Sequence, residues 1–291
     1  MSAHRAGVVA ILGRPNAGKS TLLNRILGEK LAIVTPKPQT TRSRILGIHT
    51  LPGAQILFVD TPGLHRSAKA LNLALNEQVS EAADDCDVAL LLVDRSDSWG
   101  EDHAALLARL RERSTPVLVV GAKSDLARAP GLPWPPPGVE PALAVEVSAR
   151  SGAGVEALVE AVVARLPESP RLYPEDELSD RPLRWLVAEE VREAAFEALS
   201  KELPYAMAVE VVEFDESRPE LVRIRANLLV ERASQKQIVI GRGGEMIKRI
   251  GVRARPAIER LLGVQVHLAL WVKIEPKWAK RPQRMKELGY A

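Results

Sequence analysis

The sequence predicts an α/β protein in which a domain with a mostly parallel sheet precedes a smaller α+β domain. Three observations support this prediction. A chain of 291 residues suits about two domains. Up to about residue 166, short apolar runs alternate with stretches of helical spacing, as in parallel sheets covered by helices. Beyond a Pro-rich stretch, the pattern changes to alternating strands and amphipathic helices.

The apolar runs of the first part have the length of strands, and most are apolar almost throughout. Helical stretches between most of them indicate right-handed crossovers and a parallel sheet. One pair of runs, separated by Pro-Gly-Ala, predicts an antiparallel hairpin. The expected strands are 8–12, 44–51, 55–60, 87–94, 116–122 and 142–148, of which 44–51 and 55–60 form the hairpin.

Two Pro-rich stretches have different interpretations. Residues 129–141 lie between two expected strands and predict an exposed excursion. Residues 167–181 follow the last helix of the first part and predict an interdomain linker, which gives domains of 1–166 and 182–291. In the second domain we expect the order α–β–β–α–α–β, with Trp185 and Trp271 as packing residues.

Charge is distributed unevenly, although the whole chain carries only +3. Residues 232–291 hold 14 basic and 4 acidic side chains, a net charge of +10, which indicates a polyanionic partner. The single cysteine, Cys86, excludes an internal disulfide and favours a reducing cytoplasm. The apolar runs are too short to span a membrane, and the N-terminus leaves no room for a signal peptide.

The segment GRPNAGKS, residues 13–20, fits the pattern G-x-x-x-x-G-K-[ST] directly after a strand and before a helix. Backbone N–H groups of such a turn and the start of the helix can surround a phosphate. Lys19 would add a mobile positive charge, and the Ser20 hydroxyl would ligate Mg²⁺. An ordinary glycine-rich turn is the alternative, but the complete spacing favours a phosphate site.

Two further segments have the composition of nucleotide switches. FVDTPG, residues 58–63, places Asp60 at a strand end, where it can hold Mg²⁺ through water, and Gly63 where its N–H can reach a γ-phosphate. An ordinary strand-to-loop turn is the alternative for this segment. QTTR, residues 39–42, offers a threonine that could swing onto the same ion.

Base recognition is predicted after the fifth expected strand. Asp125 can accept hydrogen bonds from both N1–H and N2–H of guanine, a pattern that adenine does not offer, while Lys123 can cover the base. The backbone N–H of Ala149, which follows the last strand of the domain, can bond the guanine O6. The order and spacing of these motifs predict a GTP-binding domain.

Together with motifs of the second half (YPED, ELPY, ERxSQK, IGRGG, IKRIG, VHLxLWVK and LGY), the chain resembles the bacterial Era GTPases from about residue 7 to residue 290. The resemblance implies a P-loop (Ras-like) GTPase domain followed by a type II KH domain. It also implies binding to the 3′ end of small-subunit ribosomal RNA and assistance in assembly of the small subunit.

The resemblance assigns site residues one by one. Nucleotide binding falls to Gly13, Arg14, Pro15, Asn16, Ala17, Gly18, Lys19, Ser20, Thr21, Asp60, Gly63, Lys123, Asp125, Ser148 and Ala149. Catalytic roles fall to Lys19, Thr41 and Gly63, and Mg²⁺ to Ser20, Thr41 and Asp60, with Thr40 as the rival of Thr41.

Three positions deserve separate expectations. Ala122 stands where the family has the Asn of N-K-x-D, and the lost amide should cost about 1 kcal/mol or more, so we expect weaker affinity with GTP specificity kept. Leu64 stands where Ras-like proteins have a water-orienting glutamine, which implies slow intrinsic hydrolysis. Asn16 is shared with GTPases that use a bound K⁺, so stimulation by K⁺ is a hypothesis.

A G-x-x-G loop, residues 241–244, lies between a short and a longer helix, where the backbone can approach a nucleic acid. A solvated surface is the alternative for the surrounding charges, and core packing is the favoured alternative for Ile240. The predicted RNA-binding residues are Lys236, Ile240, Gly241, Arg242, Gly243, Gly244, Lys248, Arg249, Lys273 and Lys277, with Lys280, Arg281, Arg284 and Lys286 following in the tail.

The favoured hypothesis is a GTP/GDP switch that binds ribosomal RNA and the assembling small subunit as a cytoplasmic monomer. The alternative is a constitutive RNA-binding module whose nucleotide domain is structural, which Ala122 and Leu64 would favour. A P-loop ATPase is disfavoured by Asp125. The basic tail would also suit peripheral contact with anionic lipid at the inner membrane, but RNA is the preferred partner.

Overall fold

The computed structural model describes residues 4–35, 37, 41, 44–63, 79–130 and 133–290. The chain forms two compact units. The first comprises Met1–Ala32 with Thr41–Asp180, and the second comprises Ile33–Thr40 with Arg181–Ala291. Within the described ranges, no helix is both long enough and apolar enough to cross a bilayer.

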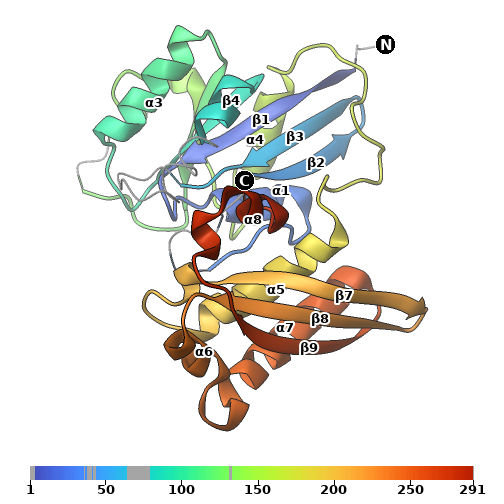
Figure 1. The fold of residues 1–291 in the computed structure, drawn as a ribbon. Coiled ribbons are helices and arrows are strands. Elements are labelled where there is room, and N and C mark those ends of the chain that lie inside the picture. The colour runs from blue at the N-terminus through green and yellow to red at the C-terminus, as the bar shows by residue number, and fades with distance from the viewer. Residues whose placement is uncertain are drawn as a thin grey trace. The chain divides into compact units, whose positions relative to one another are not determined.

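The first unit is built on a six-stranded sheet of order β2-β3-β1-β4-β5-β6 (Figure 1). All neighbouring strands are parallel except the hairpin β2–β3, so both the parallel sheet and the hairpin are confirmed. The strands are β1 (Arg5–Gly13), β2 (Ile45–Leu51), β3 (Ala54–Asp60), β4 (Val88–Asp94), β5 (Val117–Ala122) and β6 (Ala144–Glu146). The helices with described bounds are α1 (Lys19–Leu27), α3 (Glu101–Glu112) and α4 (Val155–Val163).

The carboxyl ends of the central strands meet at one edge of this sheet. Ile11 of β1 lies beside Asp60 of β3, and Asp94 of β4 lies beside Ala122 of β5. Because these strands are buried on both faces, most of their side chains are apolar, and polar groups follow at the carboxyl ends. Ligands of parallel α/β sheets bind at this edge, so the fold brings the predicted nucleotide motifs together.

The segment predicted as an interdomain linker packs within the first unit as far as Asp180. The buried Gln55 side chain accepts hydrogen bonds from the N–H groups of Leu172 and Tyr173 and donates to the Tyr173 carbonyl. The N–H of Ile48 donates to the carbonyl of Leu178. These bonds fasten the segment to the hairpin.

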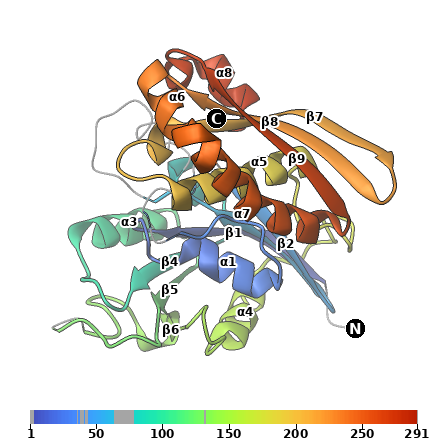
Figure 2. The same ribbon diagram turned by 90° about the horizontal axis from the view of Figure 1, so that it is seen from below.

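The second unit has the predicted order α–β–β–α–α–β. A three-stranded sheet of order β7-β8-β9 pairs β7 with β8 antiparallel and β8 with β9 parallel. Helices α5 and α7 lie on the same side of this sheet (Figures 1 and 2), and buried side chains such as Val191, Ile224 and Ile258 form the core. The elements are α5 (Leu183–Ala198), β7 (Ala208–Arg218), β8 (Leu221–Val230), α6 (Ala233–Ile240), α7 (Glu245–Leu262), β9 (Gln265–Ile274) and α8 (Pro282–Glu287).

The C-terminal segment contributes Trp278, Leu288 and Tyr290 to a small apolar cluster with Ala208 and Leu229. Trp271, by contrast, is 62% exposed, so its prediction as a packing residue is wrong. Its neighbour on β9, Val272, is buried in the core, and alternation along a strand then turns residue 271 away from the helices.

Candidate functional site

The phosphate loop, residues 13–18, joins β1 to α1 through unusual backbone conformations. Gly13 has φ +145°, and a Cβ there would lie 2.6 Å from the carbonyl oxygen of Leu92. Gly18, at φ +97°, precedes α1 without a side-chain cap, and the first turn of this fully described helix holds no acidic residue. The N-terminal N–H groups of α1 are therefore available to an anion.

Lys19 is buried beneath this loop. Its ammonium donates hydrogen bonds to the carbonyl oxygens of Gly13 (3.1 Å) and Arg14 (2.9 Å). Burial lowers the pKa of Lys19 to about 8, although the carboxylate of Asp60 opposes the shift. A phosphate at the loop would supply the counter-charge that a buried ammonium favours.

Three oxygen-bearing side chains converge beside Lys19, from α1, β3 and the residue before Arg42. The Ser20 hydroxyl donates to Asp60 Oδ2 at 2.6 Å, and Thr41 Oγ1 lies 2.9 Å from Ser20 Oγ and 3.3 Å from the same carboxylate oxygen. Asp60 is fully buried, and its Oδ1 has no hydrogen-bond partner among the described residues. Burial raises the pKa of Asp60, opposed by the charge of Lys19.

This donor set fits Mg²⁺, which takes oxygen ligands and needs few from the protein. Ser20, Thr41 and Asp60 would hold the ion. A bound ion would also give Asp60 Oδ1, which has no hydrogen-bond partner among the described residues, a positive charge to interact with. When bound, Mg²⁺ would neutralise charge on the phosphate oxygens. Thr40 and Leu64 lie outside the described residues. Among those that are described, no group of three His, Cys, Asp or Glu side chains could hold a metal.

Gly63 approaches the phosphate loop as closely as a backbone can. A Cβ at this position would lie 2.6 Å from the backbone nitrogen of Pro15 and 2.7 Å from its Cα. Only glycine therefore fits, and its N–H is held next to the loop, as its predicted γ-phosphate contact requires.

The base loop, residues 122–125, is joined to the segment after β6. The Ser148 hydroxyl, which is buried, donates to Asp125 Oδ1 at 2.7 Å, and the N–H of Ser124 donates to the Val147 carbonyl. The Ser148 bond lowers the pKa of the exposed Asp125 carboxyl and keeps it ionised. Asp125 is exposed and Ala149 is half-buried, and the guanine contacts predicted for these two residues stay predictions.

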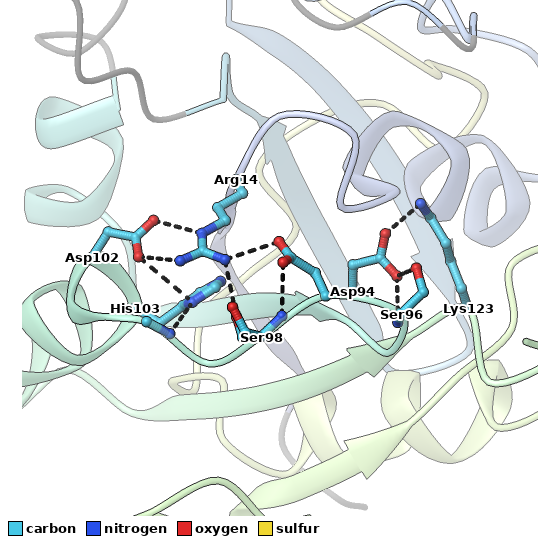
Figure 3. A network of polar contacts seen from close by, with 9 residues as sticks. Arg14, Asp94, Ser96, Ser98, Asp102, His103 and Lys123 are labelled. Atoms are coloured by element: carbon cyan, nitrogen blue, oxygen red, sulfur yellow. Dashed lines mark hydrogen bonds and ion pairs between the residues drawn. The ribbon is translucent and has the colours of Figure 1, made fainter. Parts of the chain in front are cut away.

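A loop that the sequence analysis passed over contacts both nucleotide loops (Figure 3). This acidic loop, residues 94–102, binds the Arg14 guanidinium through Asp102 (2.6 and 2.7 Å) and Asp97 (2.9 Å). At its other end, Asp94 accepts a hydrogen bond of 2.6 Å from the ammonium of Lys123. Arg14 holds the pKa of Asp102 well below its usual range.

His103, in the first turn of α3, is buried directly after the acidic loop. Its ring is 3% exposed and stacks on Trp99, with the ring centres 5.2 Å apart. Nδ1 accepts from the Gly100 N–H at 3.2 Å, and Nε2 has no hydrogen-bond partner among the described residues. Burial, and to a smaller extent the charge of Arg14, lower the pKa of His103.

We expect acid to destabilise the chain through His103. Since the folded pKa is lower than the unfolded value near 6.5, the unfolded state binds more protons in the window just below pH 6.5, and stability falls as the pH drops through it. Between about pH 7.5 and 5.5, the free energy of unfolding of His103→Gln, which keeps an acceptor for Gly100, should fall less than that of the wild type in urea denaturation. The exposed His267→Gln is the control; equal pH profiles of wild type and His103→Gln would contradict the assignment.

In the second unit, the predicted G-x-x-G loop joins α6 to α7 through three glycines with positive φ: +76° at Gly241, +59° at Gly243 and +84° at Gly244. A Cβ at Gly241 would lie 2.7 Å from that of Met246, whereas positions 243 and 244 face open space. Gly244 precedes α7 without a side-chain cap, so this helix also presents free N–H groups.

A groove of about 390 Å³ runs beside this loop between α7 and β9. Its apolar lining includes Ile247, Val252 and Leu270, and its cationic lining includes Lys248 and Arg255. This composition suits unstacked bases and a phosphate backbone. The sequence of residues 247–255 alternates apolar and basic side chains along one helix, which is a signal for one wall of this groove. The strand that forms the other wall could not be identified from the sequence.

The predicted RNA-binding residues divide into two groups. Arg242, Lys248, Lys273 and Lys277 are exposed, and Lys236 is half-buried. Ile240 packs against the core, as its alternative interpretation states, and Arg249 donates to the Ala198 carbonyl at 2.8 Å.

Two tail arginines are paired with carboxylates of their own unit, and their prediction as part of the RNA surface stays a prediction. Arg284 bonds Glu210, Glu275 and Glu287, and Arg281 bonds Glu275. Ion pairing holds both arginines to the domain that they follow.

The parallel sheet, the phosphate loop and the converging Ser20, Thr41 and Asp60 define a Ras-like GTPase domain, here followed by a KH domain. Family models agree: residues 8–123 match the 50S ribosome-binding GTPase model and residues 202–279 match the KH domain model. The chain belongs to the Era family of GTPases, since it is 45% identical to GTPase Era of Geotalea uraniireducens over 98% of each chain.

Other relatives and solved structures agree with this assignment. GTPase Era of Pseudomonas aeruginosa is 45% identical over 98% of this chain and 95% of its own. Two crystal structures align over 99% of both chains with a TM-score of 0.89. One is Aquifex aeolicus Era bound to GDP and AlF₄⁻ (37% identity), and the other is Era in complex with MgGDPNP and nucleotides 1506–1542 of 16S ribosomal RNA (36%).

Proposed function

We propose that the chain is a GTP-binding and GTP-hydrolysing switch that binds small-subunit ribosomal RNA near its 3′ end through the KH domain and assists assembly of the small subunit. One observation carries the proposal. The chain aligns along nearly its whole length with an Era structure that holds MgGDPNP and a 16S ribosomal RNA fragment together. It also has the polar groups that each ligand needs.

In the GTPase domain, the phosphate loop and Lys19 would bind the β- and γ-phosphates, and Gly63 would donate its N–H to the γ-phosphate. Asp125 and Ala149 would select guanine. Intrinsic hydrolysis would be slow because Leu64, an apolar side chain, cannot orient the attacking water. Equal rates in KCl and NaCl would exclude the stimulation by K⁺ that Asn16 suggests.

In the KH domain, the G-x-x-G loop would bring the backbone close to the RNA phosphates at the start of α7. The groove between α7 and β9 would take about four unpaired bases, as KH domains do. The exposed Arg242 and Lys248 would add charge. We place the protein in the cytoplasm as a monomer, with contact to anionic lipid at the inner membrane as a secondary property of the basic tail.

A short stretch before Thr41 supports coupling of nucleotide state to RNA binding. Residues Ile33–Thr40 belong to the second unit, whereas Thr41, the next residue, lies in the proposed Mg²⁺ site of the first. Within the second unit, the Val34 N–H donates to Glu193 at 3.1 Å, and the Lys37 ammonium donates to the carbonyls of Phe196 and Leu199 at the end of α5. A cation at that end is favoured by the helix dipole.

Titration of a short single-stranded RNA in the presence of a GTP analogue and of GDP tests the proposal. We expect at least about tenfold tighter binding with the analogue, which is about 1.4 kcal/mol of coupling. Lys37→Ala should reduce this ratio, and Lys30→Ala, an exposed lysine after α1, should not. A wild-type ratio near one would instead support the constitutive RNA-binding module.

A further inference from the structure

The acidic loop, residues 94–102, lies between the two loops that would hold the ends of the nucleotide. It leaves β4 at Asp94 and enters α3 at Glu101, and both neighbours of β4 in the sheet, β1 and β5, lead into nucleotide loops. The loop is internally fixed, since the Ser96 N–H and hydroxyl both donate to Asp94 Oδ1 and the Asp97 N–H donates to the Asp94 carbonyl.

Its hold on the phosphate loop is through Arg14. All three guanidinium nitrogens are used: Nε and Nη2 donate to Asp102, while Nη1 donates to Asp97 and to the Ser98 carbonyl. The bidentate geometry fixes the direction of the side chain as well as its position. The Arg14 carbonyl in turn accepts from Lys19, so the same residue orients the phosphate-binding ammonium.

Its hold on the base loop has three parts. Asp94 Oδ2 accepts from the Lys123 ammonium at 2.6 Å. The Arg95 N–H donates to the Ala122 carbonyl at 3.0 Å, and the Arg95 guanidinium donates to the Ser124 carbonyl at 2.9 Å. Lys123 has φ +60°, which a lysine adopts only when its surroundings enforce it.

At position 122, where the base loop faces the phosphate loop, the side chain has no polar group that could bond the two loops directly. A Cβ built at Gly18 would lie 4.0 Å from the Cβ of Ala122, so the side chain at position 122 faces the phosphate loop. The methyl side chain of Ala122 has no polar atom with which to bond that loop, whereas an amide at this position would be long enough to hydrogen-bond the loop backbone.

We propose that the acidic loop is the positioning element of this nucleotide site: Asp102 acting on Arg14 and Asp94 acting on Lys123 hold the phosphate and base loops at the spacing of a guanine nucleotide, in place of a polar side chain at position 122. The inference rests on the proposed GTP-binding function. Asp94 and Asp102 act through Arg14 and Lys123 and are positioning residues.

Fluorescent-GDP titration of the full chain tests this inference. We expect Asp94→Asn and Asp102→Asn each to weaken GDP binding by about tenfold. Asp84→Asn is the control, because both Asp84 carboxylate oxygens accept from Nη2 of Arg109 and, among the described residues, Asp84 contacts neither nucleotide loop; this variant should bind GDP as the wild type does. Thermal unfolding of each variant identifies any that fails to fold.

Rescue separates positioning from a general loss of structure. Ala122→Asn should restore GDP binding in the Asp94→Asn background to within about threefold of wild type, and should improve wild type much less. Equal improvement in both backgrounds, or undiminished GDP binding by Asp94→Asn and Asp102→Asn, would overturn the inference while the proposed function stands. A wild-type chain that does not bind GDP would overturn both.

Discussion

Asp60→Asn is expected to lower GTP hydrolysis by at least about 100-fold and to remove most of its dependence on Mg²⁺. Asp60 is the one carboxylate in the proposed ion site, and its Oδ1 has no hydrogen-bond partner among the described residues. A catalytic metal contributes several kcal/mol, and each 1.36 kcal/mol is a factor of about ten in rate. The amide oxygen can still accept from Ser20 and Thr41, so the fold should persist. Phosphate release across a MgCl₂ series is the measurement.

Asp84→Asn again serves as the control. It removes a carboxylate of the same domain whose partner is Arg109, and neither residue belongs to a nucleotide-binding motif. Its hydrolysis rate should equal that of the wild type. If Asp60→Asn hydrolysed GTP within threefold of wild type at every Mg²⁺ concentration, Ser20, Thr41 and Asp60 would not be the ion site. A melting temperature within a few degrees of wild type shows that the comparison concerns chemistry rather than folding.

The sheet and its nucleotide edge could be predicted because burial leaves a signal in sequence. Strands covered on both faces are apolar throughout, as in VALLLVD of β4, and the first polar or glycine residue after each run marks its carboxyl end. Parallel order then places Gly13, Asp60 and Ala122 at one edge without further information.

The acidic loop could not be predicted in the same way. Arg14 and Asp102 are 88 positions apart, and nothing in a sequence tells which carboxylate a surface guanidinium will choose. The strand order of the structure explains its place: Asp94 ends the strand that lies between β1 and β5, so its loop leaves the sheet between the two nucleotide loops.

For a related reason, net charge does not show which basic side chains are already bonded within the domain. A count of 14 basic residues in the last 60 does not show that Arg284 is engaged by three carboxylates or that Arg249 donates to a backbone carbonyl. Conversely, the polar Gln55 within an apolar strand was an available signal that a backbone segment, residues 172–173, would pack against it.

Gly243→Asp is expected to weaken binding of single-stranded RNA by at least tenfold and to leave GTP hydrolysis unchanged. Position 243 has φ +59° and open space around a built Cβ, and Asp tolerates this conformation better than most residues, so the KH domain should fold. The new carboxylate would lie beside Arg242 and the start of α7, where an RNA phosphate would bind. Gly241 cannot serve for this test, because a Cβ there would clash with Met246.

Gly243→Asn gives the matched control, since it has the shape and backbone tolerance of Asp without the charge. We expect Gly243→Asn to cost less than about threefold in RNA affinity, and the Asp variant to approach it at high salt, where phosphate repulsion is screened. Equal losses in the two variants at low salt would mean that the loop acts through backbone shape alone. No loss in either would mean that RNA binds elsewhere on the KH domain. The difference between Asp and Asn therefore measures how close a phosphate comes to the loop, because strain is common to both variants and only charge differs.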